Sequence, residues 1–291
     1  MATYSFSEPT NREDLTDVVT NISPTETPLT TAFGKTKCKS TKHEWVEDDL
    51  AEARKNAHSE GEDVTAEECA ARKRLYNYTQ IMQRSYRVTE TQQAVDTAGV
   101  ANEYAYQQYK AMKALAKDLE YALVNNTVAK VNDSKGAVPE MGGVQAFVKT
   151  NIVKPKTLDG DAIADALEMA WKQGGEPGKV YCSGKNKRLL SKMTTSNTKT
   201  VAAKEKTLTE AVDVYDSDFG RVEIVASRFM PDDKLFVLDP SLFKIAWLRN
   251  FKKNELPKTG DSKAGYIIGE MTLEAKAEKG NAIIDLSKAG A

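Results

Sequence analysis

The segment 99–125 is the feature that most constrains how this chain can fold. It contains no proline, and no glycine after Gly99. Its apolar residues recur mostly at spacings of three and four, which is the period of one face of an α-helix. They are Val100, Tyr104, Ala111, Met112, Leu115, Leu119, Ala122 and Leu123. At about 1.5 Å per residue such a helix is about 40 Å long, longer than most helices of globular proteins. The sequence therefore predicts a structural spine with one buried face.

The composition excludes several classes of protein. The 41 Lys and Arg residues nearly balance the 42 Asp and Glu residues, so the whole chain has no strong attraction to nucleic acid or anionic lipid. The mean hydropathy is -0.53, and no apolar run approaches the length of about 18 residues that a transmembrane helix needs. The first residues carry neither a basic nor an apolar stretch, so we expect no secretory signal. We expect a soluble chain of about two domains, or of one domain with long excursions.

The sequence shows no recognisable site for catalysis, for a cofactor or for a metal ion. It has no GxSxG, HExxH or Walker A motif. Its two histidines, His43 and His58, do not lie at zinc-ligand spacing from the nearest cysteines. Cys38, Cys69 and Cys182 form no CxxC pair, and we interpret them as reduced thiols. We therefore expect a protein that is not an enzyme and binds no cofactor.

Charge is unevenly distributed along the chain. Segment 43–63 has eight acidic and two basic residues, a local net charge of -6, whereas 179–206 has eight basic residues and one acidic residue, a net of +7. Strand-favouring residues at 76–79 follow the acidic segment, so residues 43–88 predict a long two-stranded excursion. Because an isolated hairpin is only marginally stable, this excursion has to lean on another surface. The first forty residues predict an arm that a neighbour orders or, as the alternative, a disordered tail.

The second half of the chain predicts an α/β unit followed by strands. Residues 143–234 contain a helix at 159–173, a strand at 180–182, a helix capped by Ser183, and a hairpin of 212–215 with 222–225. The remainder contains strands at 235–238 and 243–248, a polar loop at 250–264, and a closing hairpin of 266–275 with 282–286.

Short motifs follow one another in a fixed order along most of the chain. They are NREDL at 11–15, PTETPL at 24–29, HEWVEDDL at 43–50, EG at 60–61, NYTQI at 77–81, VTETQ at 88–92, LDP at 238–240, KTGDS at 258–262 and EMTLE at 270–274. Each motif alone has little specificity. As an ordered set they resemble the major capsid proteins of tailed bacteriophages, whose fold is shared with herpesviruses.

The resemblance implies an α+β chain with the tailed-phage major capsid fold. Its parts would be an N-terminal arm (1–42), an extended loop (43–88), a peripheral domain with the spine helix (89–142 and 235–291) and an axial domain (143–234). The implied function is self-assembly into hexamers and pentamers that form the icosahedral head shell enclosing phage DNA. Scaffolding, portal and decoration proteins would be further partners, and packaged DNA would be contacted only loosely and non-specifically. The protein would be located in the virion capsid, after assembly in the host cytoplasm, and would bind no membrane.

The two charged segments lead to a hypothesis about how copies bind one another. We expect acidic residues of the extended loop to contact a basic surface of a neighbouring subunit, which would favour correct register and fast association. The candidate residues are Glu44, Glu47, Asp48, Asp49 and Glu52 on one side and Lys185, Lys187, Arg188 and Lys192 on the other. The alternative is that the two segments are solvated loops that never meet.

Two other functions remain as alternatives. An enzyme with an unrecognised site would need polar groups converging in a pocket, and no motif indicates them. A nucleic-acid-binding module would use the basic segment 179–206, although Tyr181 is the only aromatic residue there and the total charge is balanced.

Overall fold

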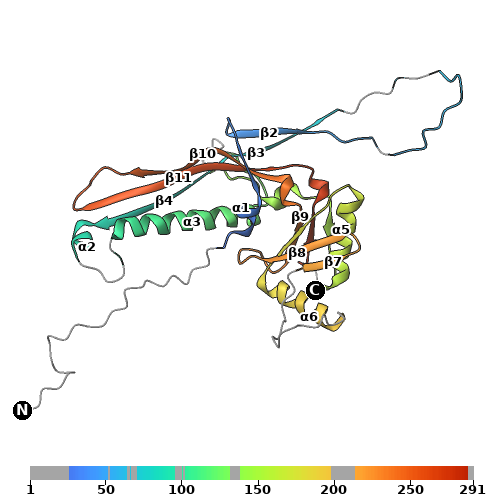
Figure 1. Ribbon diagram of the computed structural model, residues 1–291. Coiled ribbons are helices and arrows are strands. Elements are labelled where there is room, and N and C mark those ends of the chain that lie inside the picture. The colour runs from blue at the N-terminus through green and yellow to red at the C-terminus, as the bar shows by residue number, and fades with distance from the viewer. Residues whose placement is uncertain are drawn as a thin grey trace, which may run out of the picture.

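The computed structural model describes residues 26–51, 53–63, 66, 71–95, 100, 102–131, 138–197 and 214–287, with the side chains of 193–197 excepted. These residues form a four-stranded sheet, a six-stranded sheet and a separate two-stranded ribbon. A long helix runs beneath the four-stranded sheet, and the six-stranded sheet lies at one end of that layer (Figure 1).

The predicted spine helix is confirmed as α3, Glu103–Asn125. The side chain of Asn102 accepts a hydrogen bond from Ala105 N at 3.0 Å, which caps the first turn. The buried residues Leu115, Leu119 and Leu123 repeat every four positions, and this stripe packs against the sheet in the main core of the molecule. The spine helix therefore forms because its apolar face has a sheet to cover.

The four-stranded sheet has the strand order β1-β10-β11-β4. Its strands are β1 (Gly34–Lys37), β4 (Gln80–Thr89), β10 (Phe243–Glu255) and β11 (Ser262–Ala275), and the short helices α1 (Pro28–Ala32) and α2 (Glu90–Ala94) flank it. The predicted polar loop at 250–264 is wrong, because β10 continues to Glu255 and β11 begins at Ser262. The outer half of β10 pairs with β11 through the backbone while most of its side chains stay exposed, so its sequence is polar.

The six-stranded sheet has the order β5-β12-β9-β6-β8-β7. Its strands are β5 (Ile152–Val153), β6 (Lys179–Cys182), β7 (Val214–Ser217), β8 (Gly220–Ala226), β9 (Lys234–Leu238) and β12 (Ala282–Asp285), with the helices α4 (Val144–Phe147), α5 (Gly160–Lys172) and α6 (Gly184–Asn197). The predicted helix at 159–173, strand at 180–182 and hairpin near 212–225 are confirmed. Strands β9 and β12 pair with each other here, so the sheet combines strands from 143–234 and 235–291.

The predicted closing hairpin is wrong. β11 pairs with β10 and β4, whereas β12 pairs with β9 and β5 in the other sheet. Between them Ala277 adopts a left-handed conformation with φ 46°, and the single turn η3 (Glu278–Gly280) follows. The side chain of Asn281 then accepts from Asp239 N at 2.9 Å. This contact ties the start of β12 to the turn η2 (Pro240–Leu242) that follows β9, so the chain leaves one sheet and enters the next.

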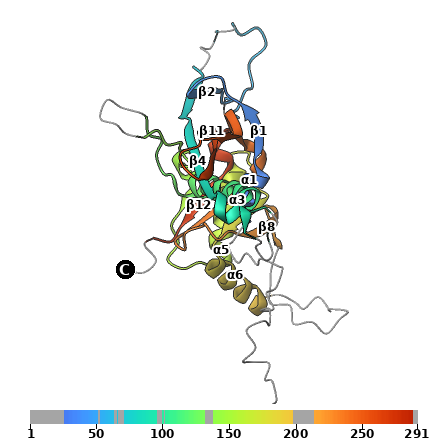
Figure 2. The same cartoon turned by 90° about the vertical axis from the view of Figure 1, so that its left-hand side faces the viewer.

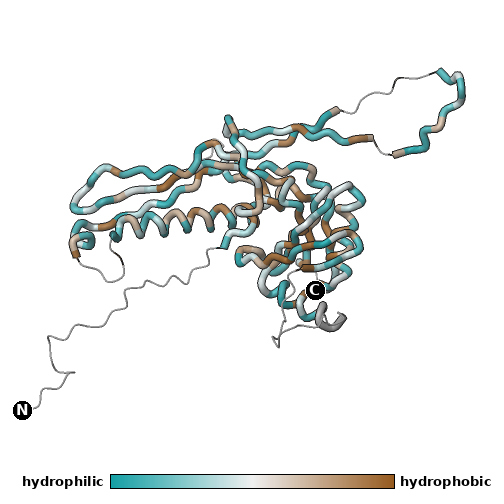
Figure 3. The backbone as a smooth tube through the Cα atoms, viewed as in Figure 1, coloured by the Kyte–Doolittle hydropathy of each residue, from teal (hydrophilic) through white to brown (hydrophobic). Residues whose placement is uncertain are grey.

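The two-stranded ribbon consists of β2 (Lys42–Glu47) and β3 (Lys73–Tyr78), which are antiparallel. β4 follows β3 directly in the chain but pairs with β11 in the four-stranded sheet, so the predicted excursion of 43–88 does not include β4. The ribbon projects beyond both sheets, whereas α6 lies on the opposite side of the molecule (Figures 1 and 2). The projecting chain is mostly hydrophilic with isolated hydrophobic positions (Figure 3). Among the described residues, no helix is long and apolar enough to cross a membrane.

Candidate inter-subunit interface

The ribbon is rooted in the body of the molecule by a buried asparagine and a tryptophan. Asn77 is fully buried. Its Nδ2 donates to the carbonyls of Gly142 at 3.0 Å and Leu273 at 2.8 Å, and its Oδ1 accepts from Gly142 N at 2.8 Å. The buried Trp45 ring lies 5.5 Å from the ring of Phe147. Because the hydrogen bonds of Asn77 and the packing of Trp45 hold the base of the ribbon against the body, they set the direction in which the ribbon leaves it.

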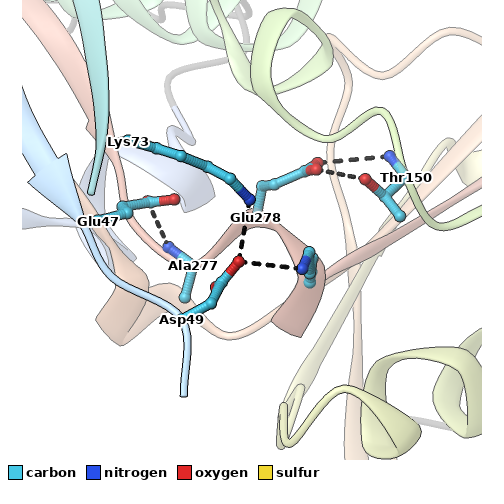
Figure 4. Close-up of polar contacts among 7 residues, drawn as sticks. Glu47, Asp49, Lys73, Thr150, Ala277 and Glu278 are labelled. Atoms are coloured by element: carbon cyan, nitrogen blue, oxygen red, sulfur yellow. Dashed lines mark hydrogen bonds and ion pairs between the residues drawn. The ribbon is translucent and has the colours of Figure 1, made fainter. Parts of the chain in front are cut away.

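Two of the predicted acidic contact residues bind the turn η3 of their own chain (Figure 4). Glu47 Oε1 accepts a hydrogen bond from Ala277 N at 2.7 Å. Asp49 Oδ2 lies 2.9 Å from Lys73 Nζ and 3.3 Å from Lys279 Nζ. The hydrogen bonds from these two lysines hold the pKa of Asp49 below its ordinary value. The same turn is held from its other side by Glu278, which accepts hydrogen bonds from the Thr150 amide and hydroxyl.

The other acidic candidates also have partners close by. Glu44 lies 2.6 Å from Lys42 Nζ and 3.5 Å from an Arg74 nitrogen. Asp48 lies 3.1 Å from Arg72 Nε. These are exposed ion pairs, which contribute little stability individually. The four described acidic candidates thus lie together along β2 and the residues that follow it, and each has a partner in its own chain. Glu52 lies outside the described residues.

The basic candidates all lie on α6. Lys185, Arg188 and Lys192 are exposed, and Lys187 is half-buried. α6 lies at the end of the molecule away from the ribbon (Figures 1 and 2), so the two charged sets do not meet within one chain. Contact between them across two copies stays a prediction.

Sequence reasoning missed a buried carboxylate under the ribbon, Glu274, and the two side chains that bind it. His43 Nε2 on β2 lies 2.7 Å from Glu274 Oε2 on β11, and Lys276 lies 3.2 Å from the other oxygen of that carboxylate. Burial raises the pKa of Glu274, but hydrogen bonds from His43 and Lys276 outweigh it and hold this pKa below its ordinary value. A signal was present, because Glu274 lies between Leu273 and Ala275 in a predicted strand, and a carboxylate buried there needs a partner.

Apolar side chains are exposed along the ribbon. Leu50 is 98% exposed, Val46 57% and Tyr76 48%. Beside the ribbon base lies a cavity of about 730 Å³, lined by Tyr76 and Phe147 among others. These side chains expose apolar area that contact with another molecule would bury.

No metal centre accompanies this surface in the described part of the chain. There, no three His, Cys, Asp or Glu side chains are grouped so that they could hold an ion. Cys38 and Cys182 are buried free thiols, and Cys69 lies outside the described residues.

The fold is that of a bacteriophage capsid protein. The structure superposes on the solved cyanophage A-1(L) capsid asymmetric unit with a TM-score of 0.71 at 11% identity, covering 96% of this chain and 98% of that one. It superposes on the solved structure of Mycobacterium phage Ogopogo with a TM-score of 0.67 at 13% identity, covering 98% and 99%. The predicted α+β major capsid fold is confirmed.

The sequence assigns the family. Residues 2–288 match the family of the SU10 major capsid protein, and the chain belongs to that family. A curated relative, the major capsid protein of Escherichia phage Phieco32, is 24% identical over 307 residues, which cover 87% of each chain. The predicted function of a major capsid protein that forms the shell is thereby confirmed, and the expected hexamers and pentamers fit the capsid neighbours.

Proposed function

We propose that the β2–β3 ribbon is the element by which each copy of this major capsid protein holds a neighbouring copy in the shell. The observation that carries this proposal is a rigid root combined with an uncovered tip. The root is fixed by Asn77 and by the contacts of Glu47 and Asp49 with η3. Val46 within the ribbon and Leu50 just after Asp49 expose apolar surface that nothing in the described part of the chain covers.

The acidic candidates take a different role in this proposal from the one the sequence suggested. Glu47 and Asp49 orient the ribbon through η3 of their own chain, and the ribbon then reaches the neighbour. Glu44 and Asp48 pair within the ribbon and its extension. The four-part division also becomes a proposal. The arm is 1–42, the extended loop is 43–88, the peripheral domain is 89–142 with 235–291, and the axial domain is 143–234. Strands β9 and β12 would complete the sheet of the axial domain.

Further partners follow from family membership rather than from a contact in the structure. Separate scaffolding, portal and decoration proteins, and assembly in the host cytoplasm before the shell joins the virion, are consistent with a major capsid protein.

The double variant Val46→Ser, Leu50→Ser tests the role of the ribbon. It removes apolar surface that is already exposed in the single chain, so subunit stability should hardly change, whereas the apolar area that the ribbon buries against a neighbouring copy becomes smaller. We expect unassembled subunits with a wild-type thermal midpoint and a several-fold lower yield of particles in negative-stain microscopy.

The matched control is Leu256→Ser, which removes an exposed leucine from the end of the four-stranded sheet. Control particles should form normally. Normal particle yield from the ribbon variant would refute the proposal.

A further inference from the structure

The exposed face of the spine helix carries three lysines. Lys110, Lys113 and Lys117 follow one another at spacings of three and four, opposite the stripe of Leu115 and Leu119 that packs against the sheet. Lys110 is exposed, and the other two are half-buried. Among the described residues, no carboxylate lies within ion-pair distance of these lysines.

Tyrosines lie between the lysines on this face. Tyr109 is 57% exposed, and Lys113 Nζ lies 4.4 Å from the centre of its ring. Lys110 Nζ lies 5.7 Å from the Tyr106 ring centre. Ammonium groups beside flat aromatic rings offer both charge and a stacking surface.

Two of the three acidic groups of the spine helix are removed from this face or neutralised. Asp118 pairs with Arg84 of β4 at 2.7 Å. Glu120 is buried and accepts hydrogen bonds from α1. Glu103, two turns before Lys110, accepts a hydrogen bond from Gln107 at 2.6 Å and keeps its charge. The stretch from Lys110 to Lys117 therefore presents positive charge, with one carboxylate at the N-terminal end of the face.

The helix α6 continues this charge on the same side of the molecule. α3 lies beneath the four-stranded sheet, and α6 lies lower still, while the ribbon projects at the opposite side (Figures 1 and 2). α6 contains no acidic residue and exposes Lys185, Arg188 and Lys192. We call the six side chains Lys110, Lys113, Lys117, Lys185, Arg188 and Lys192 the basic face.

We propose that the basic face is the surface of the shell subunit that contacts the phosphate backbone of the enclosed DNA. The inference rests on the proposed function, because only an assembled shell encloses DNA. Lysine side chains bind phosphates without reading sequence, and the tyrosine rings hold the ammonium groups of Lys110 and Lys113 in place. The distribution explains how a chain of net charge -1 binds a polyanion. The acidic residues at 44–49 lie along the ribbon, whereas the basic face lies on the other side of the molecule.

Cross-linking on the unmodified protein tests this placement directly. Genome-filled wild-type particles are irradiated with ultraviolet light, and nucleotide-linked peptides are identified by mass spectrometry. We expect linked peptides from 103–117 and from 184–192. Links confined to other segments would overturn the proposal.

Charge removal gives the second test. The triple variants Lys110→Gln, Lys113→Gln, Lys117→Gln and Lys185→Gln, Arg188→Gln, Lys192→Gln are compared with the control Lys35→Gln, Lys37→Gln, Lys39→Gln, which removes three exposed lysines from the region of β1. Full-length subunits are titrated with a labelled DNA duplex over a salt series. Each phosphate that no longer has a cationic partner should reduce the slope of log affinity against log salt by about 0.9. We expect a reduction of about two to three for each test variant and none for the control.

Particle counts by microscopy separate this inference from the proposed function. Test variants that form shells but bind DNA as the wild type does would overturn the inference and leave the proposed function standing. Test variants that fail to assemble while binding DNA normally would show that the basic face binds another copy, which also overturns the inference. A wild type that forms no particles would contradict the proposed function itself.

Discussion

At the scale of single residues, Glu120 joins the start of the described chain to the spine. Its carboxylate is fully buried and accepts three hydrogen bonds from α1, namely from Leu29 N at 2.9 Å, Thr30 N at 2.8 Å and Thr30 Oγ1 at 2.7 Å. Burial raises the pKa of Glu120 above its ordinary value, against these hydrogen bonds, which favour the charged form. A five-residue helix has little stability of its own, so this contact fixes where α1 lies on α3.

Glu120→Gln should destabilise the subunit markedly. The amide offers one acceptor oxygen and one donor group to three donors, so at least one buried N–H loses its partner. We expect a loss of about 1–3 kcal/mol in the free energy of unfolding, measured by chemical denaturation. Thr30→Val removes only the hydroxyl donor and should cost about 1 kcal/mol. If Glu120→Gln were no more destabilising than Thr30→Val, the carboxylate would not anchor α1.

At the scale of secondary structure elements, a single glycine contact couples α5 to the turn that holds the ribbon. A Cβ placed on Gly175 would lie 2.4 Å from Gly280 Cα. Gly280 is the last residue of η3. The two residues before it bind other segments: Glu278 binds Thr150, and Lys279 binds Asp49. Because the added Cβ would clash with backbone atoms of Gly280, rotation of a side chain cannot relieve the clash.

Gly175→Ala should therefore push η3 away from α5 and destabilise the subunit by about 1–3 kcal/mol, seen as a lower thermal midpoint. Gly178→Ala is the matched control, because no atom lies within 4 Å of its added Cβ and neither glycine has a positive φ. Equal midpoints for the two variants would contradict the close packing of α5 on η3.

Elements were predictable from sequence where their pattern is local. The period of three and four identified α3, and Ser183 marked the start of α6. Strand partners were not predictable, because pairing is decided by distant segments. Strand β12 is apolar on both faces, which fits a strand with neighbours on both edges as well as it fits the closing hairpin that the sequence predicted.

The candidate interface was likewise predictable only in part from the sequence. The acidic run at 44–49 was visible as charge, but its partners Lys73 and Lys279 come from β3 and η3 and are brought close only by folding. The buried pair of His43 and Glu274 joins residues far apart in sequence. Composition shows which groups are charged, whereas the fold decides which charges are already neutralised.

At the scale of the whole molecule, charge differs between two sides of the subunit. Acidic groups concentrate along the ribbon and are paired there, while the basic face lies on the opposite side. A subunit of this kind can bind its copies through the ribbon and a polyanion through the other side, although its total charge is close to zero.

Charge exchange distinguishes pairing within one chain from pairing between copies. In Asp48→Lys, Asp49→Lys, the new lysines face Arg72 and Lys73, so like charges repel at the ribbon base and particle yield should fall. Subunit stability should change little, because these ion pairs are exposed. Adding Arg72→Asp, Lys73→Asp and Lys279→Asp recreates all three pairs in reverse and should restore particles in light scattering and microscopy. Adding Lys185→Glu, Arg188→Glu and Lys192→Glu to the first variant instead should not restore particles.

Restoration by these α6 changes, and not by the changes to the ribbon's own partners, would show that the acidic ribbon pairs with α6 of a neighbouring copy.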